Sequence, residues 1–88
     1  MEYLEKLRSE IDDIDRELIK LFEKRIDIVL KIGDYKKNKN MEIFQEDREK
    51  QVLKNALSNL ENTEYSEEIV RMLSCIMDIS KDIQKEKI

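Results

Sequence analysis

Residues 4–38 read LEKLRSEIDDIDRELIKLFEKRIDIVLKIGDYKKN, and this stretch decides the fold. It contains no proline, and its single glycine, Gly33, lies near its end. Apolar side chains recur in steps of three and four residues with one gap at position 25, and these residues, called the seam below, are Leu4, Leu7, Ile11, Ile14, Leu18, Leu21, Ile28, Ile32 and Tyr35. This spacing puts the seam on one face of an amphipathic helix. We predict a long helix over about residues 2–38.

The length of that helix predicts a second copy of the chain. The chain has 88 residues, which indicates a single domain over residues 1–88. A helix of roughly 35 residues is about 50 Å long, whereas a compact chain of this size has a radius of gyration of about 12 Å. The remaining residues are too few to cover the whole helix. We therefore expect the seam to be buried in an intertwined homodimer.

Two shorter helices are predicted after the long one. The first covers about residues 45–60, and its apolar face consists of Val52, Leu53, Ala56, Leu57 and Leu60. The second covers about residues 66–85, with Ser66 as its expected N-cap and acidic residues in its first turn. Its apolar side carries Ile69, Met72, Leu73, Ile76, Met77 and Ile83. The predicted class is all-α, with one long, one short and one medium helix.

The composition argues against several classes of function. The formal net charge is −4, which argues against nonspecific binding to nucleic acid or to an anionic membrane. No apolar run approaches the ~20 residues that span a bilayer, and the start, MEYLEKLRSE, does not resemble a signal peptide. The lone cysteine, Cys75, is expected to be a small buried side chain in a reducing cytoplasm. The absence of histidine removes the commonest metal ligand and acid–base group, so we expect no metal.

Two cations lie on a face of the long helix that should be buried. Arg25 occupies the gap in the seam, and Lys36 follows it by eleven residues, about 16 Å along the same face. Gly33 lies between them and leaves room for a ligand. A small anion held between the two cations explains this arrangement. The alternative is that Arg25 reaches solvent along the apolar surface and Lys36 is an ordinary solvated lysine.

Polar residues on the other helices add to this pattern. Ser80 interrupts the apolar row of the last helix, and Gln84 follows it by four residues on the same face. A tolerated serine and a glutamine at the rim of the core are the alternative interpretation. Gln45, Arg48 and Glu49 lie at the start of the second helix, where a charged cluster is also ordinary.

Arg8 points away from Arg25. It is displaced from Arg25 by roughly 25 Å along the helix and rotated by about 100°. The two side chains can serve one small ligand only if Arg8 of the partner subunit reaches the site in an antiparallel dimer. Taken alone, Arg8 is an ordinary surface arginine.

The run LRSEIDDIDRELIKLFEKRIDIVLKIGDYKK at residues 7–37, followed by EDREK at 46–50, resembles the all-helical, AroQ-type (type II) chorismate mutases. The resemblance covers nearly the whole chain. It implies a cytoplasmic isomerase that converts chorismate to prephenate on the way to phenylalanine and tyrosine. It also implies an intertwined dimer with two equivalent sites.

The resemblance assigns roles to the interrupting residues. Arg25 and Arg8 of the partner subunit would bind the two substrate carboxylates, with help from Ser80 and the charge of Arg48. Lys36 and Gln84 would donate hydrogen bonds to the ether oxygen of the breaking C–O bond. Glu49 would accept a hydrogen bond from the ring hydroxyl. Gln45 is also expected among the substrate-binding residues, at the hydroxyl end of the pocket. The family often has an aspartate at this position, and this is the one departure from the pattern.

The implied reaction suits a chain without histidine. A unimolecular pericyclic rearrangement requires no nucleophile, proton shuttle, metal or cofactor, but it requires geometry and fixed charge. Two alternatives remain. One is an isochorismate-pyruvate lyase on the same fold, and the other is a non-enzymatic helical dimerisation module, which leaves Arg25, Ser80 and Gln84 unexplained.

Overall fold

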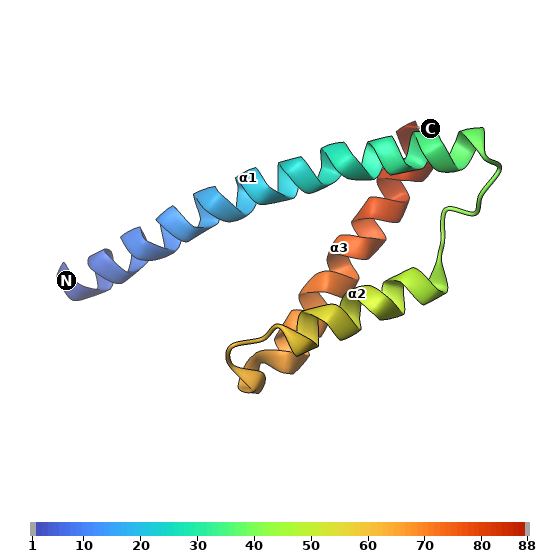
Figure 1. Cartoon of the computed structure of the whole chain (residues 1–88). Coiled ribbons are helices and arrows are strands. Elements are labelled where there is room, and N and C mark those ends of the chain that lie inside the picture. Colours follow the sequence, from blue (N-terminus) through green and yellow to red (C-terminus); the bar gives the residue numbers. More distant parts are fainter. Residues whose placement is uncertain (1, 88) are drawn as a thin grey trace.

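The computed structural model describes residues 2–87 and contains three α-helices. These are α1 (Glu2–Asn38), α2 (Glu46–Ser58) and α3 (Ser66–Lys87), and a short 3-10 turn, η1 (Thr63–Tyr65), precedes α3. No strand occurs within the described range. The all-α class with one long, one short and one medium helix is confirmed (Figure 1).

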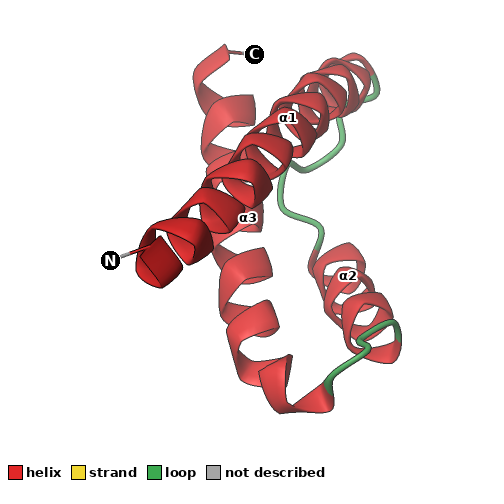
Figure 2. Cartoon of the chain, turned by 90° about the vertical axis from the view of Figure 1, so that its left-hand side faces the viewer, coloured by secondary structure: helices red, strands yellow, loops and turns green. Residues whose placement is uncertain are grey.

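The helices form an elongated molecule. Helices α2 and α3 run antiparallel as a hairpin, and α3 crosses the second half of α1 (Figures 1 and 2). The first half of α1 projects beyond the other two helices (Figure 1). The chain measures 56 × 27 × 15 Å, and its radius of gyration is 16.3 Å. This exceeds the value of about 12 Å for a compact chain of the same size, because α1 extends past everything that packs against it.

The ends of the shorter helices differ from the expected ones. Helix α2 ends at Ser58 because Asn59 leaves the helical region and its N–H bonds to the carbonyl of Ala56. Ser66 is not the N-cap of α3: it has helical dihedrals, and its hydroxyl donates to Thr63 O at 2.7 Å. The turn before α3 is capped instead by Asn62, whose Oδ1 accepts from Glu64 N at 2.9 Å.

The core of one chain is small and lies where α3 crosses α1. Its buried residues are Val29 and Gly33 of α1 and Met77 and Gln84 of α3. Phe22 and Ile26 are half-buried on α1, so the spacing 22, 26, 29 and 33 defines a second apolar face on this helix. The sequence pattern predicted only the seam, whereas α3 packs against this second face.

The seam itself remains uncovered in the single chain. From Leu7 onward all its members are exposed, namely Leu7, Ile11, Ile14, Leu18, Leu21, Ile28, Ile32 and Tyr35, with Leu21 at 60%. The expectation for Cys75 is wrong for one chain, because this residue is exposed on α3. Within residues 2–87, no helix is long and apolar enough to cross a membrane.

Candidate active site

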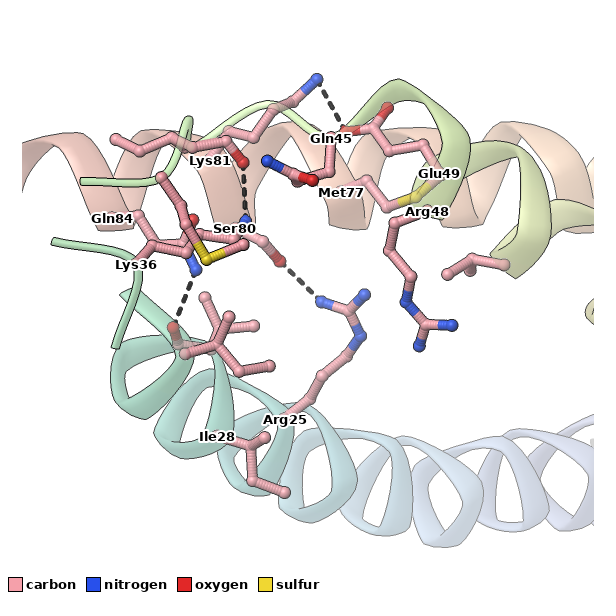
Figure 3. Close-up of a pocket in the computed structure, with 15 residues that line it drawn as sticks. Arg25, Ile28, Lys36, Gln45, Arg48, Glu49, Met77, Ser80, Lys81 and Gln84 are labelled. Atoms are coloured by element: carbon pink, nitrogen blue, oxygen red, sulfur yellow. Dashed lines mark hydrogen bonds and ion pairs between the residues drawn. The ribbon is translucent and has the colours of Figure 1, made fainter. Parts of the chain in front are cut away.

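A cavity of about 430 Å³ opens between the second half of α1, the start of α2 and the second half of α3 (Figure 3). It contains seven of the eight predicted site residues, namely Arg25, Lys36, Gln45, Arg48, Glu49, Ser80 and Gln84. Apolar side chains from all three helices and the α1–α2 loop complete the walls, among them Ile32, Ile43, Val52 and Met77. The polar residues noted separately along the sequence therefore line one cavity.

Arg25 is held by α3. Its Nη1 donates to Ser80 Oγ at 2.6 Å, and Ser80 Oγ donates in turn to Ile76 O at 2.8 Å. Partial burial lowers the pKa of the Arg25 guanidinium from its ordinary value, and the charge of Arg48 lowers it further. Within residues 2–87 no carboxylate pairs with Arg25, so its remaining N–H groups suit an anionic ligand.

Lys36 is held by the loop between α1 and α2. Its ammonium donates to Ile43 O at 2.7 Å, which uses one of its three hydrogens. The loop turns back over Lys36 at Asn40, which has a positive φ of 54°, and Met41 N donates to Lys36 O at 2.8 Å. Burial lowers the pKa of Lys36, and the nearby Glu49 carboxylate partly opposes this effect.

Gln84 is the most buried polar side chain of the site, with only 5% of its surface exposed. Its Nε2 donates to Val29 O at 2.8 Å, across the α1–α3 contact. A carbonyl oxygen can only accept, so this contact fixes the orientation of the amide, and one further N–H remains for a ligand. Lys36 and Gln84 also line a smaller cavity of about 220 Å³ together with Gly33.

The start of α2 supplies the opposite wall. Arg48 Nη1 donates to Gln51 Oε1 at 2.8 Å. Gln45 precedes the helix in extended conformation, and its Nε2 donates to Glu42 O at 2.9 Å. This contact ties the Gln45 amide to its own loop, although the residue lines the cavity.

Sequence reasoning missed Lys81, which also lines the cavity and pairs with Glu49 at 3.0 Å. Lys81 follows the buried Met77 by four residues and precedes the buried Gln84 by three, so it lies on the side of α3 that faces the cavity, but a lysine at this position gives no signal in the sequence alone. With Lys81, the cavity wall has four cations and a single carboxylate, a formal charge of +3 in a chain of net charge −4. Such a cavity attracts anions.

Arg8 is the predicted site residue that one chain does not bring to the cavity. It is exposed on the projecting first half of α1 and does not line the cavity. The described residues also contain no group of three or more acidic or cysteine side chains that could hold a metal ion.

The structure is thus an all-α chain with a strongly cationic cavity between its helices. The chain belongs to the chorismate mutase type II family, whose model matches residues 7–85. Its predicted membership of that family is thereby confirmed.

Two curated relatives match parts of the chain. The T-protein of Haemophilus influenzae is 49% identical over 49 residues, which are 56% of this chain and 13% of that protein. The bifunctional chorismate mutase/prephenate dehydratase of Aquifex aeolicus is 37% identical over 57 residues, which are 65% of this chain and 16% of that protein. The chain therefore matches only a small part of the length of these relatives.

Proposed function

We propose that this chain, as one domain over residues 1–88, is a chorismate mutase that rearranges chorismate to prephenate. The observation that carries the proposal is the cluster of Arg25, Lys36 and Gln84 around one cationic cavity in a member of this family. Chorismate carries two carboxylates, which match a cavity wall with an excess of positive charge. Arginine without a carboxylate partner in the protein is suited to bidentate carboxylate binding.

The proposed reaction is an isomerisation in which the C–O ether bond breaks while a new C–C bond forms. No atom or electron enters or leaves the substrate, so the protein contributes positioning and electrostatics. Arg25, held by Ser80, and Arg8 of the partner subunit bind the carboxylates and keep the side chain folded over the ring. Holding the reacting atoms in such a near-attack arrangement removes much of the entropic part of the barrier.

The ether oxygen gains negative charge as the C–O bond breaks. Lys36 and Gln84 are suited to stabilise it, because each is already anchored by a backbone carbonyl and retains at least one N–H. Donors fixed before the reaction need no reorganisation during it, and loss of one such donor typically costs about 10²–10³ in rate. At the α2 end of the cavity, Glu49 is the acceptor for the ring hydroxyl, and Gln45 lines the same cavity as a further substrate-binding residue.

We also propose that the functional unit is a homodimer. The exposed seam supports this, since a long apolar stripe on a helix that projects into solvent is stabilised by burial. A second copy with an antiparallel α1 also supplies the missing Arg8 to each cavity. Each of the two sites then takes residues from both chains.

The direct test is turnover of chorismate by Arg25→Leu and the unaltered chain. We expect the unaltered chain to consume chorismate, followed by loss of absorbance, and to form prephenate. Arg25→Leu should lose at least about 10³-fold in kcat/KM while its helix content is unchanged. Arg71→Leu, an exposed position on α3 outside the cavity, is the matched control and should retain full activity.

Isochorismate is assayed in parallel to separate the alternatives. Release of pyruvate from isochorismate, without prephenate from chorismate, would make the chain a lyase. A folded dimer that acts on neither substrate would contradict the proposal and favour a dimerisation module.

A further inference from the structure

Lys81 is a partly buried lysine that contacts carboxylates on two helices. Its side chain is 23% exposed, and its Nζ lies 3.0 Å from Glu49 Oε2 and 3.3 Å from Asp78 Oδ1. The ammonium also lies 4.8 Å from the centre of the Phe44 ring, which is favourable for a cation. Lys81 therefore joins α3 to α2 at the wall of the cavity, as Figure 3 shows for its contact with Glu49.

This contact differs from the surface ion pairs of the chain. Lys20–Glu17 and Lys50–Glu46 each lie within one helix, and their side chains are about two-thirds exposed or more. Such pairs contribute little to stability. The side chains of Lys81 and Glu49 are 23% and 26% exposed, so water screens their attraction less. The pKa of Lys81 is raised, chiefly by its hydrogen bond with Glu49, so the ammonium is charged throughout the neutral range.

The Glu49 carboxylate presents a problem for a cavity that takes a dianion. A carboxylate in the wall repels the two carboxylates of the substrate unless a cation compensates its charge. The hydrogen bonds of the other three cations go elsewhere: Arg25 to Ser80, Arg48 to Gln51 and Lys36 to Ile43 O. Lys36 is close enough to Glu49 for the carboxylate to raise its pKa, but within residues 2–87 it makes no ion pair with it. Lys81 is the cation in hydrogen-bond contact with Glu49, with Asp78 on its other side.

We propose that Lys81 is a positioning residue that neutralises Glu49 and fixes its orientation for the ring hydroxyl of the substrate. The contact uses Glu49 Oε2, which leaves Oε1 to accept from a ligand. Lys81 thereby lets the cavity contain an anionic hydrogen-bond acceptor without repelling an anionic substrate. The inference rests on the proposed function, because it assumes that chorismate binds in this cavity.

The test compares four variants with the unaltered chain: Lys81→Met, Lys81→Arg, Glu49→Gln and the double variant Lys81→Met/Glu49→Gln. We expect Lys81→Met to raise KM for chorismate about tenfold, because it leaves Glu49 uncompensated beside a dianion. Lys81→Arg should keep KM close to that of the unaltered chain, since it retains the cation. Lys50→Met is the matched control in the exposed pair with Glu46, and it should leave kcat and KM unchanged.

The double variant distinguishes charge compensation from a purely structural link between α2 and α3. If Lys81 compensates Glu49, then removing the negative charge of Glu49 should bring KM of the double variant back below that of Lys81→Met. The kcat of the double variant should be as low as that of Glu49→Gln, because both variants have the weakened acceptor. If Lys81 only ties two helices together, the double variant should bind chorismate no better than Lys81→Met, and the inference is overturned.

A second neutral variant keeps the test open if Lys81→Met does not fold. Lys81→Gln can still donate a hydrogen bond to Glu49 but carries no charge, and it should show the same rise in KM. A KM within about twofold of the unaltered value in the folded neutral variant overturns the inference alone. Absence of chorismate turnover by the unaltered chain overturns the proposed function, and the inference with it.

Discussion

Lys36 and Gln84 illustrate how this site is built at the scale of single residues. Each side chain crosses from one element to the backbone of another, Lys36 to Ile43 O and Gln84 to Val29 O. A side chain that is anchored in this way loses little further conformational freedom when it binds a ligand. The two hydrogen bonds therefore stabilise the fold and hold the remaining N–H groups in the cavity.

The lowered pKa of Lys36 makes a prediction for pH dependence. The ammonium form is the donor, and burial favours its loss of a proton at a lower pH than for an ordinary lysine. We expect kcat/KM to fall as the pH rises through this lowered pKa. The pKa of Lys81 is shifted in the opposite direction, so Lys36 loses its proton first.

The measurement is a pH profile of kcat/KM between neutral and strongly basic pH. Lys36→Arg is the matched variant, because a guanidinium keeps its charge throughout this range. We expect its rate to be lower, since the geometry differs, but the alkaline fall should disappear or move to higher pH. An alkaline fall at the same pH in both proteins would assign the titration to another group.

Site residues differ in how far the sequence could predict them. Arg25, Ser80 and Gln84 interrupt apolar rows, and this conflict with burial makes them visible without a structure. Lys81 gives no such signal alone, because a lysine on a helix is usually solvated, and its role depends on Glu49 of a different helix. The side-chain contact of Gln45 with its own loop likewise depends on a loop conformation that local sequence does not fix.

At the scale of helices, α1 has two apolar faces with different uses. The face at 22, 26, 29 and 33 is covered by α3 in the same chain, whereas the seam is exposed. The seam was predictable because its repeat runs along nearly the whole helix. The second face was not, because it is confined to the half of the helix that α3 crosses. Arg25 lies at the border of the two faces, which explains how one residue interrupts the seam and still reaches Ser80.

The seam predicts the effect of a charge on assembly. Ile14→Lys places an ammonium in the middle of the seam, where burial against a second copy would desolvate it. We expect this variant to be monomeric or much more weakly dimeric, with loss of helix content in the first half of α1. The measurement is molecular mass by light scattering over a range of concentrations.

Ser9→Lys is the matched control for this variant. It adds the same charge to an exposed position of α1 that lies off the seam, and it should leave the molecular mass unchanged. If Ile14→Lys and the unaltered chain have the same mass, the seam is not the dimer interface.

At the scale of the whole molecule, charge and shape point to the same arrangement. The chain is acidic overall, whereas the cavity wall carries four cations and a single carboxylate. The molecule is 56 Å long because half of α1 has nothing beside it, and Arg8 lies on that half. The sequence predicted this incompleteness from helix length alone. The position of Arg8 relative to a cavity could not be predicted in the same way, because it depends on how two chains meet.

In the proposed dimer, each site combines Arg25 of one chain with Arg8 of the partner subunit. The most direct test mixes two inactive proteins, Arg8→Ala and Arg25→Ala, and lets their subunits exchange. A mixed dimer has one site with both arginines and one with neither, so random exchange of equal amounts should restore about a quarter of the unaltered mutase activity. Each protein incubated alone should stay inactive. Exchange that demonstrably produces mixed dimers without restoring prephenate formation would contradict the shared site.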